Sequence, residues 1–431
     1  MRPTIIHKNN ESGAHTRRGG WLTAEDKYLQ ACYPMAQLLD LALASDVPQH
    51  KLLRGTGIFV EDLASQAHMN GGVRFNVRQL AVLADNIAHY LPQDEIASRW
   101  GARLWPGYAG PFSQALATAT DLGDFLQILC EFRHWLAPGL VPCMSQFNGY
   151  RILHWQNVFG LSTRAEKLLS EAYMTALVSV TREQCQENNS GWICCPGQCD
   201  AAQLRRMRVY CGEETTAGAG GCFMAIPEAF LSRPWATGSP RIRDMAIAQA
   251  KTLMTGIPAE SFAEQVASYL SHRFPELPSL SDTASYFGIS SATLKRYLAV
   301  DGMRYQQVGD QIRLRYSLEL MHFECGSNED IADALRLGDG ANFRRSFRRW
   351  TGILPSEARE ALSGRLPPLN VERDSSYSSP SYSSPSYSSA SYSSASYSSA
   401  SYSSASYSSA SYSSASYSSP KSAQSIRSHR Q

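Results

Sequence analysis

Four arginines stand close together in one short stretch of this 431-residue chain: Arg344, Arg345, Arg348 and Arg349. Arg344 with Arg348, and Arg345 with Arg349, are four residues apart, so that in a helix they form two adjacent basic pairs. A guanidinium group can bind phosphate and can also form two hydrogen bonds to the edge of a guanine base. The pattern predicts a surface that binds nucleic acid, although an arginine-rich helix face is often merely solvated.

These arginines need a helix whose other side is buried. Phe343, Phe347 and Trp350 recur at i, i+4 and i+7, which predicts an apolar stripe on that helix. Residues 331–337 precede it with a short segment of small and apolar residues, and together the two segments predict a helix-turn-helix unit. The candidate DNA contacts of this unit are Asn342, Arg344, Arg345 and Arg348.

An earlier unit of the same kind is predicted over residues 280–298. Ala284 allows two helices to cross closely, and Gly288 can take the left-handed conformation that a tight turn between them requires. Ser290 is a good N-cap for the second helix, which Leu294 and Leu298 hold down by one face. The residues left for DNA contact are Ser291, Thr293, Lys295 and Arg296. A long helix predicted over residues 305–322 would set the distance between the two units.

Together the two units resemble the DNA-binding domain of AraC/XylS-type bacterial transcription regulators. That family has a recognition helix of the form S-x-x-T-L-x-R-x-L and a second unit that ends in F-x-R-x-F-[KR]-x-W-x-G-x-x-P-x-x-x-R. This chain supplies those positions as Ser290, Thr293, Leu294, Arg296, Leu298, Phe343, Arg345, Phe347, Arg348, Trp350, Gly352, Pro355 and Arg359. The resemblance implies an all-α domain that binds promoter DNA through two recognition helices, with RNA polymerase as a further partner.

Two positions depart from the family pattern. The second turn usually contains Gly-Phe, whereas this chain has Arg336 and Leu337. An arginine there must either adopt an unfavourable φ or change the turn, and the angle of the second recognition helix depends on the outcome. In the first recognition helix, Ala292 replaces the long polar side chain that is common in the family, so the target sequence cannot be copied from a relative. The charges of the domain nearly balance, and binding must therefore depend on their placement.

Residues 21–255 mix helical and strand-like segments. Helices are predicted over 33–44, 75–90, 122–135, 165–182 and 241–255, a hairpin over 146–155 with Asn148-Gly149 as its turn, and short strands at 209–211 and 222–227. This mixed α+β order is similar, more loosely, to the arabinose-binding type of N-terminal effector domain, with matching marks at 55–63, 107–109, 122–126 and 223–231. The resemblance implies a small-molecule effector, whose identity stays unknown, and a homodimer. Arg103, Trp105 and Tyr108 offer charge and aromatic surface, but aromatic residues at such a place are more often part of a core.

Six cysteines cluster between residues 185 and 222: Cys185, Cys194, Cys195, Cys199, Cys211 and Cys222. They have neither the close C-x-x-C pairs nor the matching histidines of a zinc site, so we expect structural or incidental thiols. A redox- or metal-sensing regulator remains the alternative function. No phosphate loop, metalloprotease helix or nucleophile elbow is present, and we predict no enzyme activity, catalytic residue, metal or cofactor.

The ends of the chain differ from its middle. We predict a flexible leader at 1–20, the effector domain at 21–255, the DNA-binding domain at 256–362 and a disordered tail at 363–431. The tail repeats Ser, Tyr and Ala with a period of five, which fits neither a helix nor a strand and cannot bury a core. It is either a neutral repeat expansion or a self-associating segment, and an interaction protein centred on it is a second alternative function.

The chain contains no signal peptide and no apolar run of membrane-spanning length, from which we expect a cytoplasmic location without membrane contact.

Overall fold

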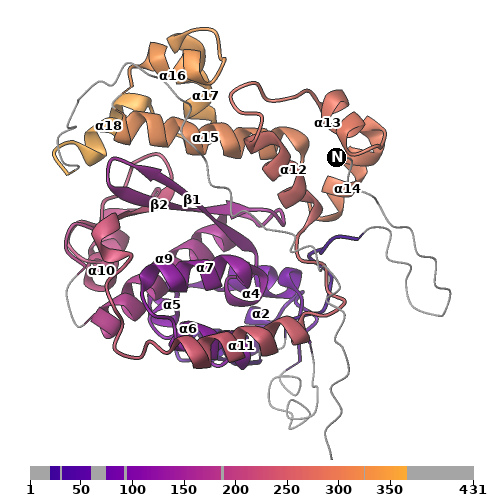
Figure 1. Cartoon of the computed structure of the whole chain (residues 1–431), viewed down its shortest axis with the longest axis vertical. Helices are drawn as coiled ribbons and strands as arrows, with labels where there is room; N and C mark the ends of the chain where they lie inside the picture. Colours follow the sequence, from indigo (N-terminus) through magenta and orange to yellow (C-terminus); the bar gives the residue numbers. More distant parts are fainter. Residues whose placement is uncertain are drawn as a thin grey trace, which may run out of the picture. The chain divides into compact units, whose positions relative to one another are not determined.

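A four-stranded antiparallel sheet is the centre of the N-terminal domain in the computed structural model of the chain (Figure 1). Its strands lie in the order β1 (Leu140–Phe147), β2 (Tyr150–Asn157), β4 (Cys222–Pro227) and β3 (Ile193–Pro196). β1 and β2 form the predicted hairpin, and Phe147 pairs with Tyr150. Asn148 and Gly149 between them have φ of 46° and 76°, the positive values that a two-residue type I′ turn requires. The hairpin prediction is therefore confirmed.

The structure describes residues 20–29, 32–59, 74–91, 95–185, 189–324 and 326–365. All of these belong to one compact unit. The predicted leader, apart from Gly20, and the predicted tail beyond Arg365 lie outside the described residues. The mixed α+β domain followed by an all-α domain, as predicted, is confirmed.

Ten α-helices and one 3-10 helix accompany the sheet within the described part of the N-terminal region. They are α1 (Cys32–Leu43), α2 (Gln49–Leu52), α4 (Val77–Tyr90), α5 (Ile96–Gly101), α6 (Pro111–Ala117), α7 (Leu122–Glu131), α8 (Arg133–Leu136), α9 (Thr163–Cys185), α10 (Ala201–Cys211), η2 (Glu228–Phe230) and α11 (Pro240–Leu253). The helices predicted at 33–44, 75–90, 165–182 and 241–255 correspond to α1, α4, α9 and α11, and they are confirmed.

Two predictions need correction. The helix predicted over 122–135 breaks at Phe132, whose φ and ψ of −107° and 26° separate α7 from α8. The strand predicted at 209–211 is wrong, because these residues are the last turn of α10. Asp200 caps that helix by accepting a hydrogen bond from the backbone N–H of Gln203. The helix-forming residues that follow the cap outweigh the strand preference of the short Val-Tyr-Cys segment.

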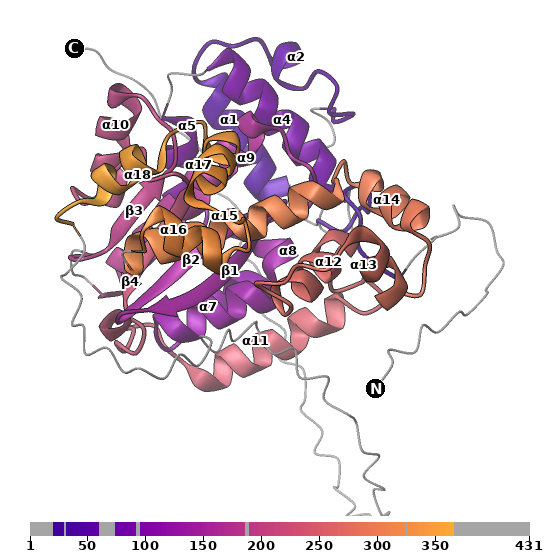
Figure 2. The same ribbon diagram turned by 90° about the horizontal axis from the view of Figure 1, so that it is seen from above.

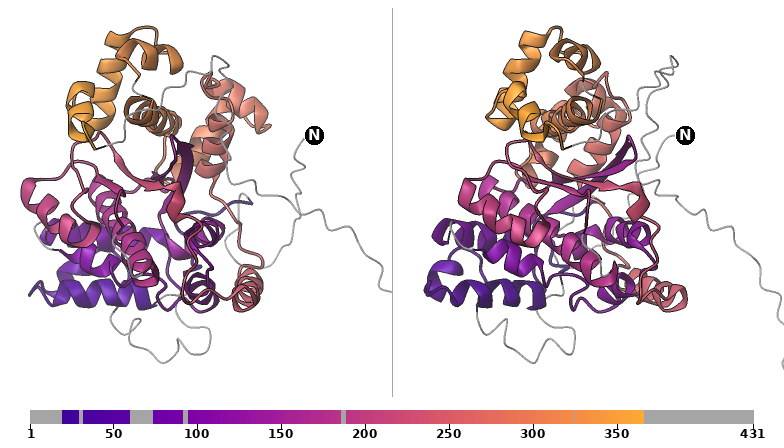
Figure 3. Two further views of the ribbon diagram at one scale, coloured as in Figure 1. Left: turned by 60° about the vertical axis from the view of Figure 1, so that its left-hand side comes forward. Right: turned by 90° about the vertical axis from the view of Figure 1, so that its left-hand side faces the viewer.

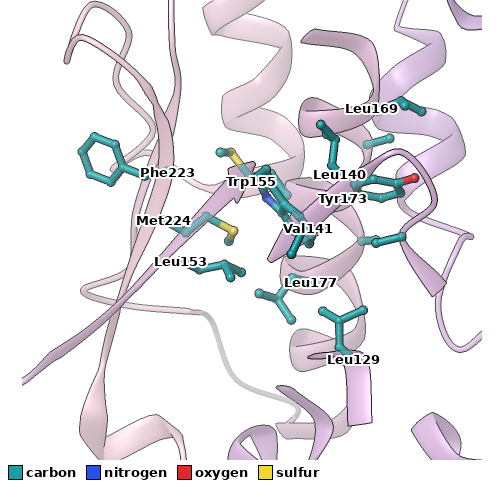
Figure 4. Close-up of a cluster of buried hydrophobic side chains, with 14 of the residues drawn as sticks. Leu129, Leu140, Val141, Leu153, Trp155, Leu169, Tyr173, Leu177, Phe223 and Met224 are labelled. Atoms are coloured by element: carbon teal, nitrogen blue, oxygen red, sulfur yellow. The ribbon is translucent and has the colours of Figure 1, made fainter. Parts of the chain in front are cut away.

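The core of the N-terminal domain lies between the sheet and α9. Leu153 and Trp155 of β2 point towards Tyr173 and Leu177 of α9, whereas Phe223 of β4 projects from the other face of the sheet (Figure 4). Trp105 also belongs to this core, because its ring stacks on Tyr173 at 5.9 Å between centroids. The expectation that Trp105 is a core residue is confirmed, whereas Tyr108 is exposed.

The C-terminal domain is built from seven helices in the described residues: α12 (Phe262–Ser271), α13 (Leu280–Tyr286), α14 (Ser291–Val300), α15 (Tyr305–Phe323), α16 (Asn328–Ala334), α17 (Gly340–Thr351) and α18 (Pro355–Leu362). The long helix predicted over 305–322 is α15 and is confirmed. The pair α13–α14 lies towards one end of α15, and the pair α16–α17 towards the other (Figure 2). Two helix-turn-helix units are therefore connected by one rigid helix.

α15 packs on the face of the sheet opposite to α9 (Figure 3). Side chains alternate along β2, so that Trp155 faces the α9 core and His154 faces α15. Glu319 of α15 accepts a hydrogen bond from Ser145 of β1 at 2.6 Å, and its carboxylate lies 3.5 Å from His154 Nε2. The imidazole of His322 lies 2.8 Å from the Ala219 carbonyl. The C-terminal domain is therefore held against the sheet by buried polar contacts.

Candidate nucleic-acid interface

The turn of the first unit has the predicted geometry. Gly288 has φ of 67°, and the N–H of Ile289 donates to the Ala284 carbonyl at 3.0 Å. Ser290 caps α14 by accepting a hydrogen bond from the N–H of Thr293 at 3.1 Å. Leu294 and Leu298 are fully buried and hold α14 down by one face. The predicted roles of these residues in the turn, the cap and the core are confirmed.

The other face of α14 carries the four predicted contact residues. Lys295 and Arg296 are exposed, whereas Ser291 and Thr293 are half-buried. The hydroxyl of Thr293 lies 2.9 Å from that of Ser290, so it also takes part in the helix cap. One face of α14 is therefore buried and the other presents two cations to solvent, which is the arrangement that a recognition helix needs.

The second unit repeats this scheme in α16 and α17. Asp339 caps α17 by accepting from the N–H of Asn342, while Phe343 and Phe347 are fully buried and Trp350 is half-buried. Arg359 of α18 donates to the Asn328 side chain and to the Gly326 carbonyl, both at 2.8 Å. Arg359 therefore ties α18 to the start of α16, a role that its place in the sequence motif did not reveal.

The four arginines of α17 are all exposed but differ in their partners. Arg349 forms an ion pair with Asp310 of α15 at 3.3 Å, and Arg345 donates to the side chain of Asn342. Within the described residues, no hydrogen bond or ion pair engages the guanidinium groups of Arg344 and Arg348. Arg344, Arg345 and Arg348 therefore keep donors for an anionic partner, whereas Arg349 is partly neutralised.

Arg336 adopts the unfavourable positive φ, and the second turn therefore keeps the same backbone geometry as the first. Its φ is 55°, beside 67° for Gly288 in the first turn. The N–H of Leu337 donates to the Ala332 carbonyl at 2.8 Å, which repeats the Ile289 to Ala284 bond. The two turns thus have matching backbone geometry, and arginine in place of glycine costs the strain of a left-handed residue with a side chain.

The variant Arg336→Gly is expected to stabilise the chain by about 1 kcal/mol, because glycine takes this φ without steric cost. Urea unfolding would measure the gain. Arg336→Ala is the matched control, since it also removes the exposed 3.9 Å pair with Glu276 but keeps the Cβ atom. Equal stability of the two variants would show that the left-handed backbone at this position stores no strain.

A buried ion cluster, which no sequence pattern indicated, joins the two domains. Glu264 of α12 accepts from Arg133 Nε at 2.6 Å and lies 2.9 Å from Nε2 of His134, and all three side chains are less than a tenth exposed. Burial alone would raise the pKa of Glu264, but the electrostatic effects of His134 and Arg133 outweigh it and lower the pKa to about 2. We call these three residues the buried cluster. Glu264 lies more than a hundred residues from Arg133 and His134 in the sequence. No spacing pattern in a single sequence could therefore have predicted their contact.

The start of the described chain also packs on the C-terminal domain. The ring of Trp21 lies 4.8 Å from that of Phe262 and 4.7 Å from that of Tyr297, measured between centroids. Asp301 accepts a hydrogen bond from the Ala24 N–H at 2.8 Å, and burial raises the pKa of this carboxyl to about 6. Residues 20–29 thus contact α12, α14 and the turn that follows α14.

Three of the six clustered cysteines are buried, and the other three are half-buried. Cys194 and Cys195 lie on β3 and are fully buried, and Cys211 at the end of α10 is also buried. A hydrogen bond with Cys211 and burial raise the pKa of Cys194, and burial raises that of Cys195. Raised pKa values disfavour the thiolate that redox sensing needs. Within the described residues, no group of three or more His, Cys, Asp or Glu side chains could hold a metal ion. The sensor alternative stays a prediction.

Comparison with known families supports both domains. A family model described as "Helix-turn-helix domain" matches residues 283–361. A second model, described as "Arabinose-binding domain of AraC transcription regulator, N-term", matches residues 47–235. Among the described residues, no helix is both long and apolar enough to cross a membrane.

Known regulators are similar to parts of the chain. The ornithine utilization regulator of Pseudomonas aeruginosa is 34% identical over 140 residues, 32% of this chain and 41% of the relative. The HTH-type transcriptional regulator VqsM of the same organism is 28% identical over 141 residues, 32% of this chain and 43% of the relative. The chain thus matches less than half the length of these relatives. A solved structure, the transcriptional regulator CdpR from Pseudomonas aeruginosa, matches 76% of this chain and 98% of its own chain at 18% identity. The TM-score of this match is 0.30, which is too low to show a shared fold.

Proposed function

Because the chain belongs to the AraC-type family of transcription regulators, we propose that it binds specific promoter sequences in response to a small-molecule effector. One observation supports the DNA-binding part of this proposal. The two helix-turn-helix units have matching turns, and each presents exposed cations on the free face of its second helix. Two recognition helices on one rigid connector suit two successive segments of the major groove.

The proposed contacts divide between the two helices. On α14 they are Ser291, Thr293, Lys295 and Arg296, and on α17 they are Asn342, Arg344, Arg345 and Arg348. Arginine serves both phosphate and base edges, and the side chain of Asn342 holds Arg345 in place by accepting its hydrogen bond. We assign base reading to Arg345, because an oriented guanidinium can form two hydrogen bonds to guanine.

The variant Arg345→Ala is expected to weaken operator binding by about 1–3 kcal/mol and to relax specificity at one base pair. Fluorescence anisotropy with operator DNA and with random DNA would measure both effects. Arg349→Ala is the matched control on the same helix, because its partner Asp310 already neutralises part of its charge. An equal loss on operator and random DNA would instead make Arg345 a phosphate contact.

The experiment that tests the function is selection of genomic fragments by the purified full-length protein at near-physiological salt. We expect a recovered motif with two sub-sites about one helical turn apart, one for each unit. Recovery of a single short sub-site would contradict the role given to α17. Recovery of no motif, with and without cell extract as a source of effector, would contradict the function itself.

The proposed partners are double-stranded promoter DNA, an effector, RNA polymerase and a second copy of the chain. The last two rest on the family resemblance. The name of the ornithine utilization regulator does not transfer an effector, because the similarity spans only a third of this chain.

A further inference from the structure

A cavity of about 120 Å³ lies between the N-terminal domain and α15. We call it the interdomain cavity. Strands β1, β2 and β4 and helix α9 line one side of it, and residues 311–318 of α15 line the other. Its polar lining includes Asn157 and Glu166 from the N-terminal domain and Gln311 and Arg315 from α15. The amide of Gln311 donates to the Asn157 carbonyl at 3.1 Å, so the cavity lies beside a direct hydrogen bond between the domains.

Arg315 brings a buried positive charge to this cavity. Burial alone would lower its pKa, but the electrostatic effects of Cys143 and Glu319 outweigh it and raise the pKa. Its Nε is buried and has no hydrogen-bond partner, and within the described residues no carboxylate lies within 4 Å of its guanidinium group. Glu319, one turn further along α15, accepts from Ser145 through one carboxylate oxygen, which lies 3.5 Å from His154 Nε2, and its other oxygen is buried without a hydrogen-bond partner. The neighbours Cys143 and Tyr316 stay neutral near pH 7, since burial raises the pKa of both. A carboxylate is the group that a buried guanidinium binds best, through charge-assisted hydrogen bonds.

Glu166 of α9 brings the opposite charge to the same cavity. One carboxylate oxygen accepts from Asn157 Nδ2 at 2.8 Å, and no cationic side chain of the described residues lies within 4 Å. Burial raises the pKa of this carboxyl, so a cation beside it would restore its charge. Glu166 and Arg315 form no ion pair with each other, and they reach the cavity from α9 and from α15, on its two sides. A ligand with a negative and a positive group would satisfy both.

We propose that the interdomain cavity is the effector site and that it binds a small α-amino acid. Its carboxylate binds Arg315 and its ammonium group binds Glu166. A cavity volume of about 120 Å³ suits a small side chain. Only the role of the amino acid as an effector rests on the proposed function, because its binding can be measured without DNA.

A ligand here would act directly on DNA binding. α15 supplies Gln311, Ile312, Leu314, Arg315 and Leu318 to the cavity, and the same helix packs against α12, α16, α17 and α18. An amino acid that binds both Glu166 and Arg315 connects α9 to α15. It thereby fixes α15 on the sheet, and with it the orientation of both recognition helices relative to the N-terminal domain. The ligand shifts the equilibrium by as much as it prefers this docked arrangement.

Isothermal titration of the full-length protein would test the site. The probes are glycine, L-alanine and L-serine, with isobutyrate and isopropylamine as isosteres of alanine that lack the ammonium or the carboxylate. At least one amino acid is expected to bind at least tenfold more tightly than isobutyrate, and isopropylamine is expected not to bind. Equal affinity for alanine and isobutyrate, or no binding of any amino acid at concentrations up to about 10 mM, would overturn the proposal.

Three variants make the assignment specific. Arg315→Gln should lose amino-acid binding, and Glu166→Gln should reduce it to the affinity of isobutyrate. Arg313→Gln is the matched control, because Arg313 lies on the same helix, pairs with Asp310 and does not line the cavity. Unchanged binding by Arg315→Gln, folded as judged by its melting temperature, would overturn the proposal. If Arg315→Gln does not fold, the conservative Arg315→Lys must retain weak binding. Binding of an amino acid by a protein that selects no DNA motif would leave the site standing and refute the proposed function alone.

Discussion

Replacement of Glu264 by glutamine is expected to lower the free energy of unfolding by about 3 kcal/mol, the lower end of the range for one partner of a buried ion pair. The change keeps the side-chain shape and its oxygen, which accepts from the N–H of Ser261 at 2.7 Å in the capping box of α12. What it removes is the negative charge that compensates Arg133 inside the protein. Glu260, 3.6 Å from Arg133, still offers partial compensation. Urea unfolding followed by tryptophan fluorescence would measure the loss.

The control for this prediction is Glu131→Gln. Glu131 pairs with Lys251 at 2.7 Å, but both side chains are 40% or more exposed. Solvent screening limits such a pair to less than about 1 kcal/mol. Similar losses in the two variants would show that the buried cluster contributes no more than a surface pair.

The same cluster predicts a pH dependence. The pKa of Glu264 falls from 4.5 to about 2 on folding, so its contribution to stability is complete above 4.5. As the pH falls from 4.5 towards 2, the carboxylate is protonated in the folded state as well and the contribution disappears. The stability difference between the wild type and Glu264→Gln should therefore be constant near neutral pH and should vanish near pH 2. Acid titrations of both proteins in urea would check this.

Replacement of Gly160 by alanine is expected to force the two domains apart. A Cβ atom at Gly160 would lie 2.4 Å from the backbone oxygen of Asp301 and 2.9 Å from the carbonyl carbon of Gly302. Backbone atoms cannot rotate away as a side chain can, so the clash must separate the loop before α9 from the turn after α14. Overpacking and a φ of 58° together cost about 2–5 kcal/mol. Calorimetry should show the single transition divide into two, because the domains lose their mutual support.

Gly149→Ala is the matched control for the backbone strain. Gly149 also has a positive φ, 76°, but no atom lies within 4 Å of the added Cβ. It should lose only about 1–2 kcal/mol, with the cooperativity of unfolding unchanged. A Gly160→Ala protein that unfolds in one transition, like this control, would contradict the proposed coupling between the domains.

Local signals in the sequence predicted the local features of the structure. The hairpin turn at Asn148, the helix cap at Ser290 and the buried stripe of Phe343 and Phe347 each depend on residues a few positions apart. For Arg336 the sequence offered two outcomes, and the structure shows the unfavourable φ. The strand predicted at 209–211 was wrong because three residues carry too little information against a capped helix that begins eight residues earlier, at Ala201.

The contacts between the domains could not be predicted in this way. Glu264 was visible as part of a capping box, Ser261-x-x-Glu264, but nothing near it pointed to Arg133. Arg315 likewise occupies an ordinary position in a helix, and its significance depends on which residues of the sheet lie opposite. The DNA contacts stay predictions, because a side chain that reads a base and one that is merely solvated can be equally exposed.

The packing of residues 20–29 has a consequence for the engineering of hybrid regulators. The chain contributes Trp21, Leu22 and Ala24 to a domain whose helices begin some 240 positions later, so this domain is discontinuous in sequence. A graft that transplants only residues after 255 onto a foreign sensor would leave Phe262 and Tyr297 without the indole that covers them. Such a chimera needs the N-terminal segment as well, joined at a second junction or added as a separate peptide. A recipient sensor must accordingly accept two crossovers rather than a single end-to-end fusion.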